Sequence, residues 1–266
     1  SSNLVYNQAK EASLKSLQNM QDDIYVFIKG IENKLIDIYN RKDLIHDLSE
    51  GMDYKAMKLK YAQLATDMGN YTFDPSQGVK ALYIYDIQNR LISFYCHAAT
   101  PRYTYPEDIY ENPEENNAYI VKEYVESDNM IMMISNYYNE NSKENIIRFV
   151  LKIYANNSMR KIGYVICDID EKGFKKIIKK YVYSKEQIVW LQPIGAQTVI
   201  LVGTLTESNK NYYDDATSLI YNNIWQSEHN IISKDNVFFE VPQEKYNLDA
   251  FSLTPLFLLK EKRSSM

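Results

Sequence analysis

The chain has 266 residues and a formal net charge of −5 with acids and bases interspersed, so we expect no basic face for nucleic acid or anionic lipid. Hydrophobic residues make up 45% and charged residues 24%, which permits a buried core and argues against disorder. The eight glycines are too few for several Gly-rich phosphate loops, and the two cysteines, Cys96 and Cys167, do not make a disulfide framework. We expect no nucleic-acid partner and no cofactor.

The first fifty residues predict one long helix. Leu4 to Glu50 contains no Pro and a single Gly, Gly30, and apolar residues recur at a strict heptad interval at Leu17, Ile24, Ile31, Ile38 and Ile45. At 1.5 Å per residue, such a helix extends about 70 Å, which exceeds the width of a small domain. It must therefore support more than one module.

A second helix and a first sheet follow. Asp53 is a suitable N-cap for a helix that runs to Met68, and Gly69 is a suitable stop. The next residues predict a hairpin of Ala81–Asp86 and Leu91–Tyr95, a loop or short helix at 100–113, a helix at 117–127, and strands at Met130–Tyr138, Ile146–Tyr154 and Lys161–Asp168.

The second half repeats this order of elements without residue-level identity. It predicts a helix at Gly173–Tyr181, a hairpin of Ile188–Leu191 and Thr198–Gly203, a helix at 213–226, and strands at 230–232, Val237–Val241 and Ala250–Leu259.

Two segments carry a resemblance to a known family. They are the hairpin Ala81–Tyr95, with its Tyr-Asp-Ile-Gln-Asn-Arg-Leu-Ile pattern, and the run Ile162–Asp170, directly followed by a helix. Together with the long first helix they resemble the double Cache (dCache) sensor domains of bacteria. The resemblance implies an α+β fold in which a long N-terminal helix precedes two PAS-like modules, each a mainly antiparallel sheet flanked by helices. The implied divisions are a spine helix at 1–50, a membrane-distal module at 51–170, a membrane-proximal module at 171–260 and a tail toward the membrane at 261–266.

The resemblance also implies a function. Such domains are the extracellular ligand-sensing parts of transmembrane receptors: sensor histidine kinases of two-component systems, chemoreceptors, and some membrane-bound regulators of Gram-positive bacteria. We therefore expect a small molecule to bind in the distal module and a conformational change to pass to the membrane. The alternative is an interaction module that binds a partner protein and has no small-molecule pocket.

The sequence contains no run of the roughly 18–20 apolar residues that a membrane span requires. The apolar run Leu256–Leu259 is followed by a charged segment, Lys260–Met266. We interpret the chain as an excerpt of a membrane protein, on the extracellular side of the cell membrane, whose spans lie outside both ends. A complete cytosolic protein is the alternative.

Motifs of catalysis and metal binding are not found. The three histidines, His46, His97 and His229, are far apart, and no HExxH, CxxC, GxSxG, GxGxxG or P-loop pattern occurs. The acidic run 168–171 lacks the Gly and Glu positions of a calcium loop, and we interpret it as a solvated strand end. We predict neither catalytic residues nor a metal site, and hence no enzyme.

A ligand site is expected where the segment 95–119 crosses the first sheet. This segment supplies Arg102, Tyr103 and Tyr105, and the facing strands supply tyrosines and Arg148. Because a guanidinium offers a two-pronged donor, arginine flanked by tyrosine hydroxyls suits a carboxylate-bearing ligand. The predicted ligand-binding residues are Tyr83, Tyr95, Arg102, Tyr103, Tyr105, Tyr138 and Arg148. The structural alternative is that Arg102 is a solvated loop charge and the tyrosines pack the sheet.

Amino-acid sensors of the double Cache family carry spaced Tyr, Arg, Trp-Tyr and a later Asp. Tyr95, Arg102 and Tyr103 match fragments of that motif, but its Trp is absent, because Trp190 and Trp225 both lie in the second half and are expected in its core. The motif therefore does not predict amino-acid specificity.

The heptad stripe has two possible partners, the modules of its own chain or a second copy. Lys34 and Arg41 interrupt its d positions, which argues against a coiled coil along the whole length. We expect packing within the chain and a partial homodimer contact near the N-terminal half.

Overall fold

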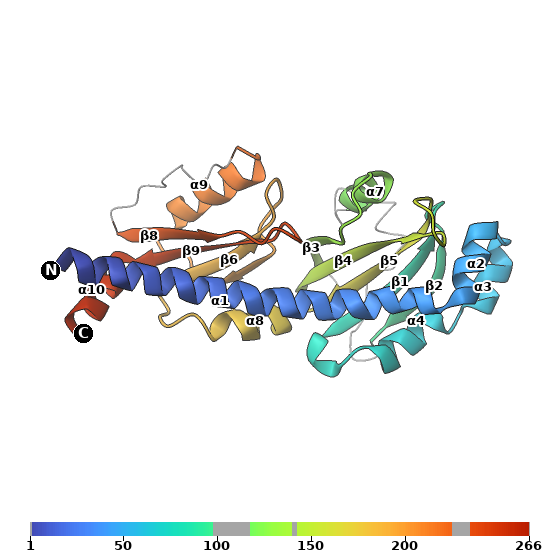
Figure 1. Ribbon diagram of the computed structural model, residues 1–266, viewed down its shortest axis with the longest axis horizontal. Coiled ribbons are helices and arrows are strands. Elements are labelled where there is room, and N and C mark those ends of the chain that lie inside the picture. Colours follow the sequence, from blue (N-terminus) through green and yellow to red (C-terminus); the bar gives the residue numbers. More distant parts are fainter. Residues whose placement is uncertain (1, 98–117, 140–142, 225–234, 266) are drawn as a thin grey trace. The chain divides into compact units, whose positions relative to one another are not determined.

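A computed structural model describes residues 2–97, 118–139, 143–224 and 235–265. They form a long N-terminal helix and two antiparallel sheets flanked by helices, which confirms the predicted α+β fold (Figure 1). The chain divides into two compact units, residues 28–173 (the central unit) and residues 1–27 with 174–266 (the terminal unit). No helix in the described ranges combines the length and apolarity needed to cross a membrane.

The first helix, α1 (Ser2–Ile36), contributes residues up to Phe27 to the terminal unit and from Ile28 onward to the central unit. The prediction of one helix to Glu50 was wrong. A 3-10 turn, η1 (Asp37–Asn40), follows α1, and Arg41 leaves the helical region with φ −84° and ψ 75° before α2 (Lys42–Glu50) begins. Neither Pro nor Gly marks this break, so sequence could not show it.

The heptad positions of the predicted stripe are buried throughout. Leu17 is 6% exposed, and the later members are at most 1% exposed: Ile24, Ile31, Ile38 and Ile45. This burial arises within one chain, which confirms the expected intrachain packing.

The second predicted helix is also divided, into α3 (Tyr54–Lys60), α4 (Leu64–Asp67) and a π-helical turn, η2 (Met68–Thr72). The predicted N-cap is confirmed, because the Asp53 carboxylate accepts a hydrogen bond of 3.2 Å from the Ala56 amide. A short 3-10 turn, η3 (Pro75–Gln77), leads to the first strand.

The sheet of the central unit has the order β2-β1-β5-β4-β3, and every neighbouring pair is antiparallel. Its strands are β1 (Val79–Asp86), β2 (Leu91–Cys96), β3 (Met133–Asn139), β4 (Glu144–Tyr154) and β5 (Lys161–Ile169). Helix α7 (Ala118–Glu126) covers one face, and α4 lies on the other (Figure 1). The predicted β1–β2 hairpin is confirmed.

The sheet of the terminal unit has the order β7-β6-β9-β8. Its elements are α8 (Lys172–Lys179, entering from the central unit), β6 (Ile188–Gln192), β7 (Ile200–Val202), α9 (Lys210–Tyr221), β8 (Asn236–Val241), β9 (Asp249–Pro255) and α10 (Leu256–Ser265). The strand predicted to reach Leu259 ends at Pro255, where the ring removes the ladder donor and the chain turns into α10. The strand predicted at 230–232 lies outside the described residues.

The two faces of this second sheet are covered by α9 and by α1. On the α9 side Trp190 is fully buried, stacks on Phe251 at 5.5 Å and donates from Nε1 to Gln192 Oε1 at 3.0 Å, so its predicted core role is confirmed. On the α1 side the Gln21 amide donates to the carbonyls of Val241 and Leu248, both at 3.0 Å. Trp225 lies outside the described residues.

Candidate functional site

One face of the central sheet combines a buried charge pair with aromatic residues. Side chains of alternate positions on β1, β4 and β5 point to this face and pack under Val121, Tyr124 and Val125 of α7. The face is apolar and aromatic under α7, with the charged Lys152 at the C-terminal end of that helix and Arg148 and Asp168 further along the strands. A few polar groups within an apolar surround are typical of small-molecule sites.

The charge pair joins neighbouring strands. Arg148 of β4 lies directly opposite Asp168 of β5, and its Nε and Nη2 bind the two carboxylate oxygens at 2.8 and 2.7 Å. The two residues are 2% and 0% exposed. This two-pronged geometry is the strong form of an ion pair, and burial makes either partner costly to remove alone.

Two tyrosines surround the pair. The hydroxyl of Tyr137 on β3 donates to Asp168 Oδ2 at 3.0 Å, and the Arg148 guanidinium carbon lies 4.2 Å from the centroid of the Tyr137 ring. The Tyr83 ring of β1 lies on the other side of the guanidinium at 5.9 Å. The guanidinium is therefore held between two aromatic rings, where cation–π attraction adds to the ion pair.

Burial disfavours the charge of Arg148, but the Asp168 carboxylate and the Tyr137 hydroxyl outweigh it and hold the pKa of Arg148 above its usual value. The guanidinium is thus permanently charged. Among the described residues its Nη1 has no hydrogen-bond acceptor, although the atom is buried. A buried charged donor without an acceptor is suited to bind a ligand oxygen.

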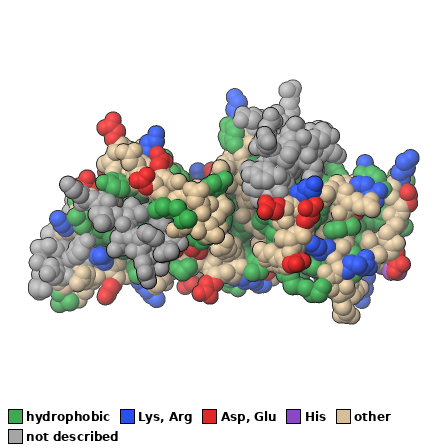
Figure 2. Space-filling model, turned by 90° about the horizontal axis from the view of Figure 1, so that it is seen from above, with side chains coloured by type: hydrophobic (Ala, Val, Ile, Leu, Met, Phe, Trp, Pro, Cys, Tyr) green, Lys and Arg blue, Asp and Glu red, His purple; other side chains and the backbone are tan. Residues whose placement is uncertain are grey.

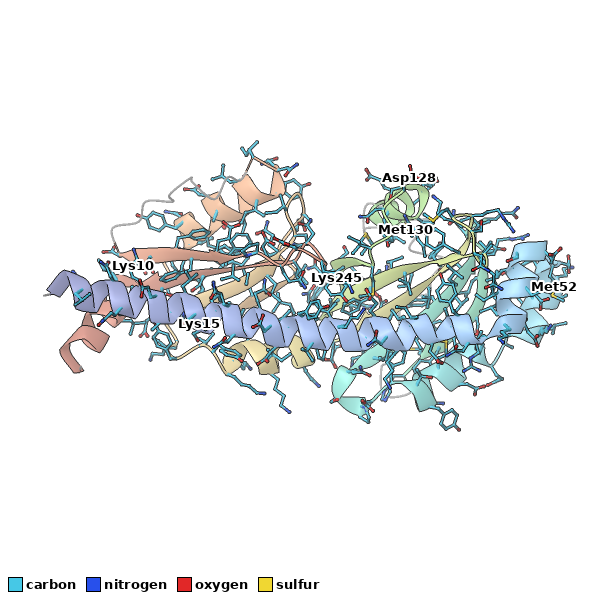
Figure 3. The ribbon with its side chains drawn as sticks, in the orientation of Figure 1. Lys10, Lys15, Met52, Asp128, Met130 and Lys245 are labelled. Atoms are coloured by element: carbon cyan, nitrogen blue, oxygen red, sulfur yellow. The ribbon has the colours of Figure 1, made fainter. Side chains whose placement is uncertain are left out.

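Two lysines fix the end of the covering helix. Lys152 of β4 donates from Nζ to the carbonyls of Ser127 and Asn129 at 2.7 and 2.5 Å. Lys161 of β5 binds the carbonyls of Val125, Glu126 and Ser127 at 3.0 to 3.1 Å. Figure 3 labels Asp128 and Met130 in the segment that these lysines hold. Burial, followed by repulsion from Lys161, lowers the pKa of Lys152 to about 8.

Only part of the predicted site comes together. Tyr83 and Arg148 meet on the face under α7. Tyr95 lies on the opposite face of β2, where its ring covers Gly69, and Tyr138 is half exposed on the outer side of β3. Arg102, Tyr103 and Tyr105 lie outside the described residues, so their role stays a prediction.

Asp168 was missed, because the run 168–171 was interpreted as a solvated strand end. That interpretation was wrong for Asp168, which is the last inward-facing position of β5 and fully buried. The available signal was the alternation of β5, where Tyr164, Ile166 and Asp168 share one face.

Of the two cysteines, Cys167 is buried and Cys96 half-buried, and both are free. No group of three or more metal-binding side chains occurs in the described part of the chain.

The comparisons with known proteins bear on the fold. Neither a protein-family model nor a curated protein sequence matches the chain. The sensory domain of the Campylobacter jejuni chemoreceptor Tlp3 (CcmL) has a similar structure, with a TM-score of 0.59 at 10% sequence identity, covering 97% of this chain and 98% of that chain. The same domain with isoleucine bound gives 0.57 at 11% identity and 97% of both chains. The ligand-binding domain of Mlp24 with asparagine gives 0.55 at 8% identity, covering 98% and 99%.

The chain shares the fold of these sensory and ligand-binding domains. The match extends over both sheets, because nearly all of each chain is covered. At about 10% identity this likeness establishes the fold alone, and the bound isoleucine and asparagine are properties of those two proteins.

Proposed function

We propose that this chain is the ligand-sensing domain of a bacterial transmembrane receptor and binds a small carboxylate-bearing molecule on the α7 face of the central sheet. The single observation that supports the site is Arg148, a buried, permanently charged guanidinium whose Nη1 has no acceptor among the described residues. A ligand carboxylate would accept from Nη1, beside the pair already formed with Asp168. Arg102, Tyr103 and Tyr105 would contribute from the segment between β2 and α7.

The chemistry also suggests which carboxylates to test first. Tlp3 and Mlp24 are known with isoleucine and asparagine bound, and an α-amino acid carries a carboxylate and an ammonium group. Arg148 and Asp168 offer the complementary charges side by side. We therefore propose α-amino acids and related small carboxylates as the ligand class.

In this proposal the domain lies outside the cell, between membrane spans that are not part of this sequence, and α1 passes the ligand-induced change toward the membrane. A histidine kinase or a chemoreceptor would supply the output. A homodimer contact along the N-terminal half of α1 would be measured by analytical ultracentrifugation. Fusion of the receptor to topology reporters would test the extracellular location.

The decisive experiment is a thermal-shift and calorimetric screen of amino acids and simple carboxylates. A ligand present at 100 times its Kd stabilises the folded domain by about 2.7 kcal/mol, which is a measurable shift. Arg148→Lys keeps the charge but loses the fork, and we expect it to weaken binding at least tenfold. Arg90→Lys, at an exposed ion pair with Asp86, is the matched control and should bind as the wild type does.

Removal of Arg148 alone would leave Asp168 buried and unpaired, at a cost of roughly 3–5 kcal/mol. The double variant Arg148→Met with Asp168→Leu avoids this cost and should fold without binding the ligand. Retained binding in the double variant would show that Arg148 does not bind the ligand. A complete lack of ligands in the screen would contradict the sensing function.

A further inference from the structure

The terminal unit contains a second hollow, unrelated to the face under α7. It has a volume of about 390 Å³, within the roughly 300–1,000 Å³ of small-molecule sites. It lies between α9 and the β6–β7 connection, and its lining is Gln192, Gln197, Thr198, Asp214, Thr217, Ser218 and Tyr221. Every lining side chain carries a group that can form hydrogen bonds, and the Tyr221 ring adds an apolar surface.

The hollow is held in shape by bonds between its two walls. Gln192, which is fully buried, donates from Nε2 to the carbonyls of Ala196 and Thr217 at 2.8 and 3.0 Å. The Gly195 amide donates to the Ile220 carbonyl at 2.8 Å. These bonds tie the β6–β7 connection to α9, so a ligand would meet an organised site.

The helical wall has a regular pattern. Asp214, Thr217, Ser218 and Tyr221 are spaced i, i+3, i+4 and i+7, which places them on one face of α9. Within the described residues, no hydrogen bond or ion pair engages the Asp214 carboxylate, the Gln197 amide or the Tyr221 hydroxyl. The Tyr221 side chain is 48% exposed, so its ring is available for contact.

We propose that this hollow binds a neutral polyhydroxylated molecule of the monosaccharide or sugar-alcohol class. Among the described residues, no Lys, Arg or His lines it, which disfavours an anionic ligand. A single carboxylate can accept hydrogen bonds from two neighbouring hydroxyls, and the Gln197 amide can both donate and accept. The exposed ring of Tyr221 supplies an apolar surface for the C–H side of a sugar ring.

Hydrogen bonds to neighbouring residues orient two of the polar side chains in the wall of the hollow. On its inner side, Trp190 Nε1 donates to Gln192 Oε1 and fixes the orientation of that amide. The hydroxyl of Tyr213 donates to Thr198 Oγ1 at 3.1 Å, which leaves the Thr198 proton available to a ligand. The wall therefore presents both donors and acceptors, as a polyhydroxylated ligand requires.

Nuclear magnetic resonance titration of the whole domain tests the proposal. D-glucose, D-galactose, D-ribose and D-mannitol are added up to 50 mM, and amide shifts of residues 195–198 and 214–221 are followed. We expect saturable shifts at these amides with at least one of the four compounds. Asp214→Asn and Tyr221→Ala should each weaken that binding at least tenfold.

Asp215→Asn is the matched control, because Asp215 is the next residue on α9, is also exposed, and does not line the hollow. It should leave the titration unchanged, and so should Arg148→Lys, which separates this site from the carboxylate site. The proposal is overturned if none of the four compounds gives saturable shifts, or if Asp214→Asn binds like the wild type. Saturable binding of ethanolamine in place of the sugars would overturn the ligand class.

Discussion

At the scale of single residues, two buried charges have opposite consequences for stability. Asp168 forms an ion pair with Arg148 and accepts a hydrogen bond from the Tyr137 hydroxyl. Asp249, the first residue of β9, is 6% exposed and accepts one amide hydrogen bond, from Gln243 at 3.0 Å. Burial, together with repulsion from Glu240, raises the pKa of Asp249 to about 6.

The raised pKa predicts that Asp249→Asn stabilises the protein at neutral pH. The folded state holds the Asp249 proton more tightly than the unfolded state, so this residue lowers the free energy of unfolding as pH rises from about 4 to 6. Asparagine keeps the acceptor oxygen without the charge, and the expected gain at pH 7 is on the order of 1–3 kcal/mol. Urea unfolding at pH 4, 5, 6 and 7 measures it.

Glu244→Gln in the same turn is the control for this prediction, because Glu244 is exposed. Its unfolding free energy should follow that of the wild type at every pH. A constant difference between Asp249→Asn and the wild type from pH 4 to 7 would show that Asp249 titrates normally.

At the scale of elements, α7 depends on the sheet below it for its C-terminal end. A nine-residue helix is marginal by itself, and the negative end of its dipole is neutralised by Lys152 and Lys161. Lys161→Met should therefore speed amide hydrogen exchange in residues 121–126 at least threefold, with no change in β1. Lys122→Met, on the exposed side of α7, is the control. Unchanged exchange in Lys161→Met would mean that apolar packing under α7 is sufficient.

The same scale shows what sequence could and could not predict. The β-rich runs and turn residues predicted the strands, and Arg148 was predicted to lie on a strand that faces the crossing segment. These patterns could not predict that β5 lies between β1 and β4, and so they could not pair Arg148 with Asp168. The break after Ile36 was also hidden, because it arises from backbone angles at Arg41 and a side-chain bond of 2.7 Å from Asn40 to Asp37, with no Pro or Gly.

At the scale of the whole molecule, α1 is shared by the two compact units. Its terminal-unit part is held by Gln21 and by the β8–β9 turn, where the Lys245 ammonium lies 5.9 Å from the centre of the Tyr25 ring (Figure 3). In the view of Figure 2, charged side chains of both signs are interspersed over the described surface.

The continuity of α1 can be interrupted at Val26, which is 67% exposed and lies one residue before the division between the units. Proline there removes a backbone hydrogen bond and clashes with the preceding turn, at a cost of about 3 kcal/mol. Val26→Ala keeps the helix and is the control. Hydrogen exchange with and without a carboxylate ligand measures the effect in both units.

If α1 carries the response, ligand should slow exchange in β4, β5 and the β8–β9 turn in Val26→Ala, but only in β4 and β5 in Val26→Pro. Protection of β4 and β5 in both variants shows that the central unit still folds and binds, so the loss at the turn reports transmission alone. Equal protection of the turn in Val26→Pro would mean that an unbroken α1 is not required. The response would then pass through other contacts of the chain. In either case, the ligand can shift the conformation of the turn only if it binds two conformational states of the domain with unequal affinity.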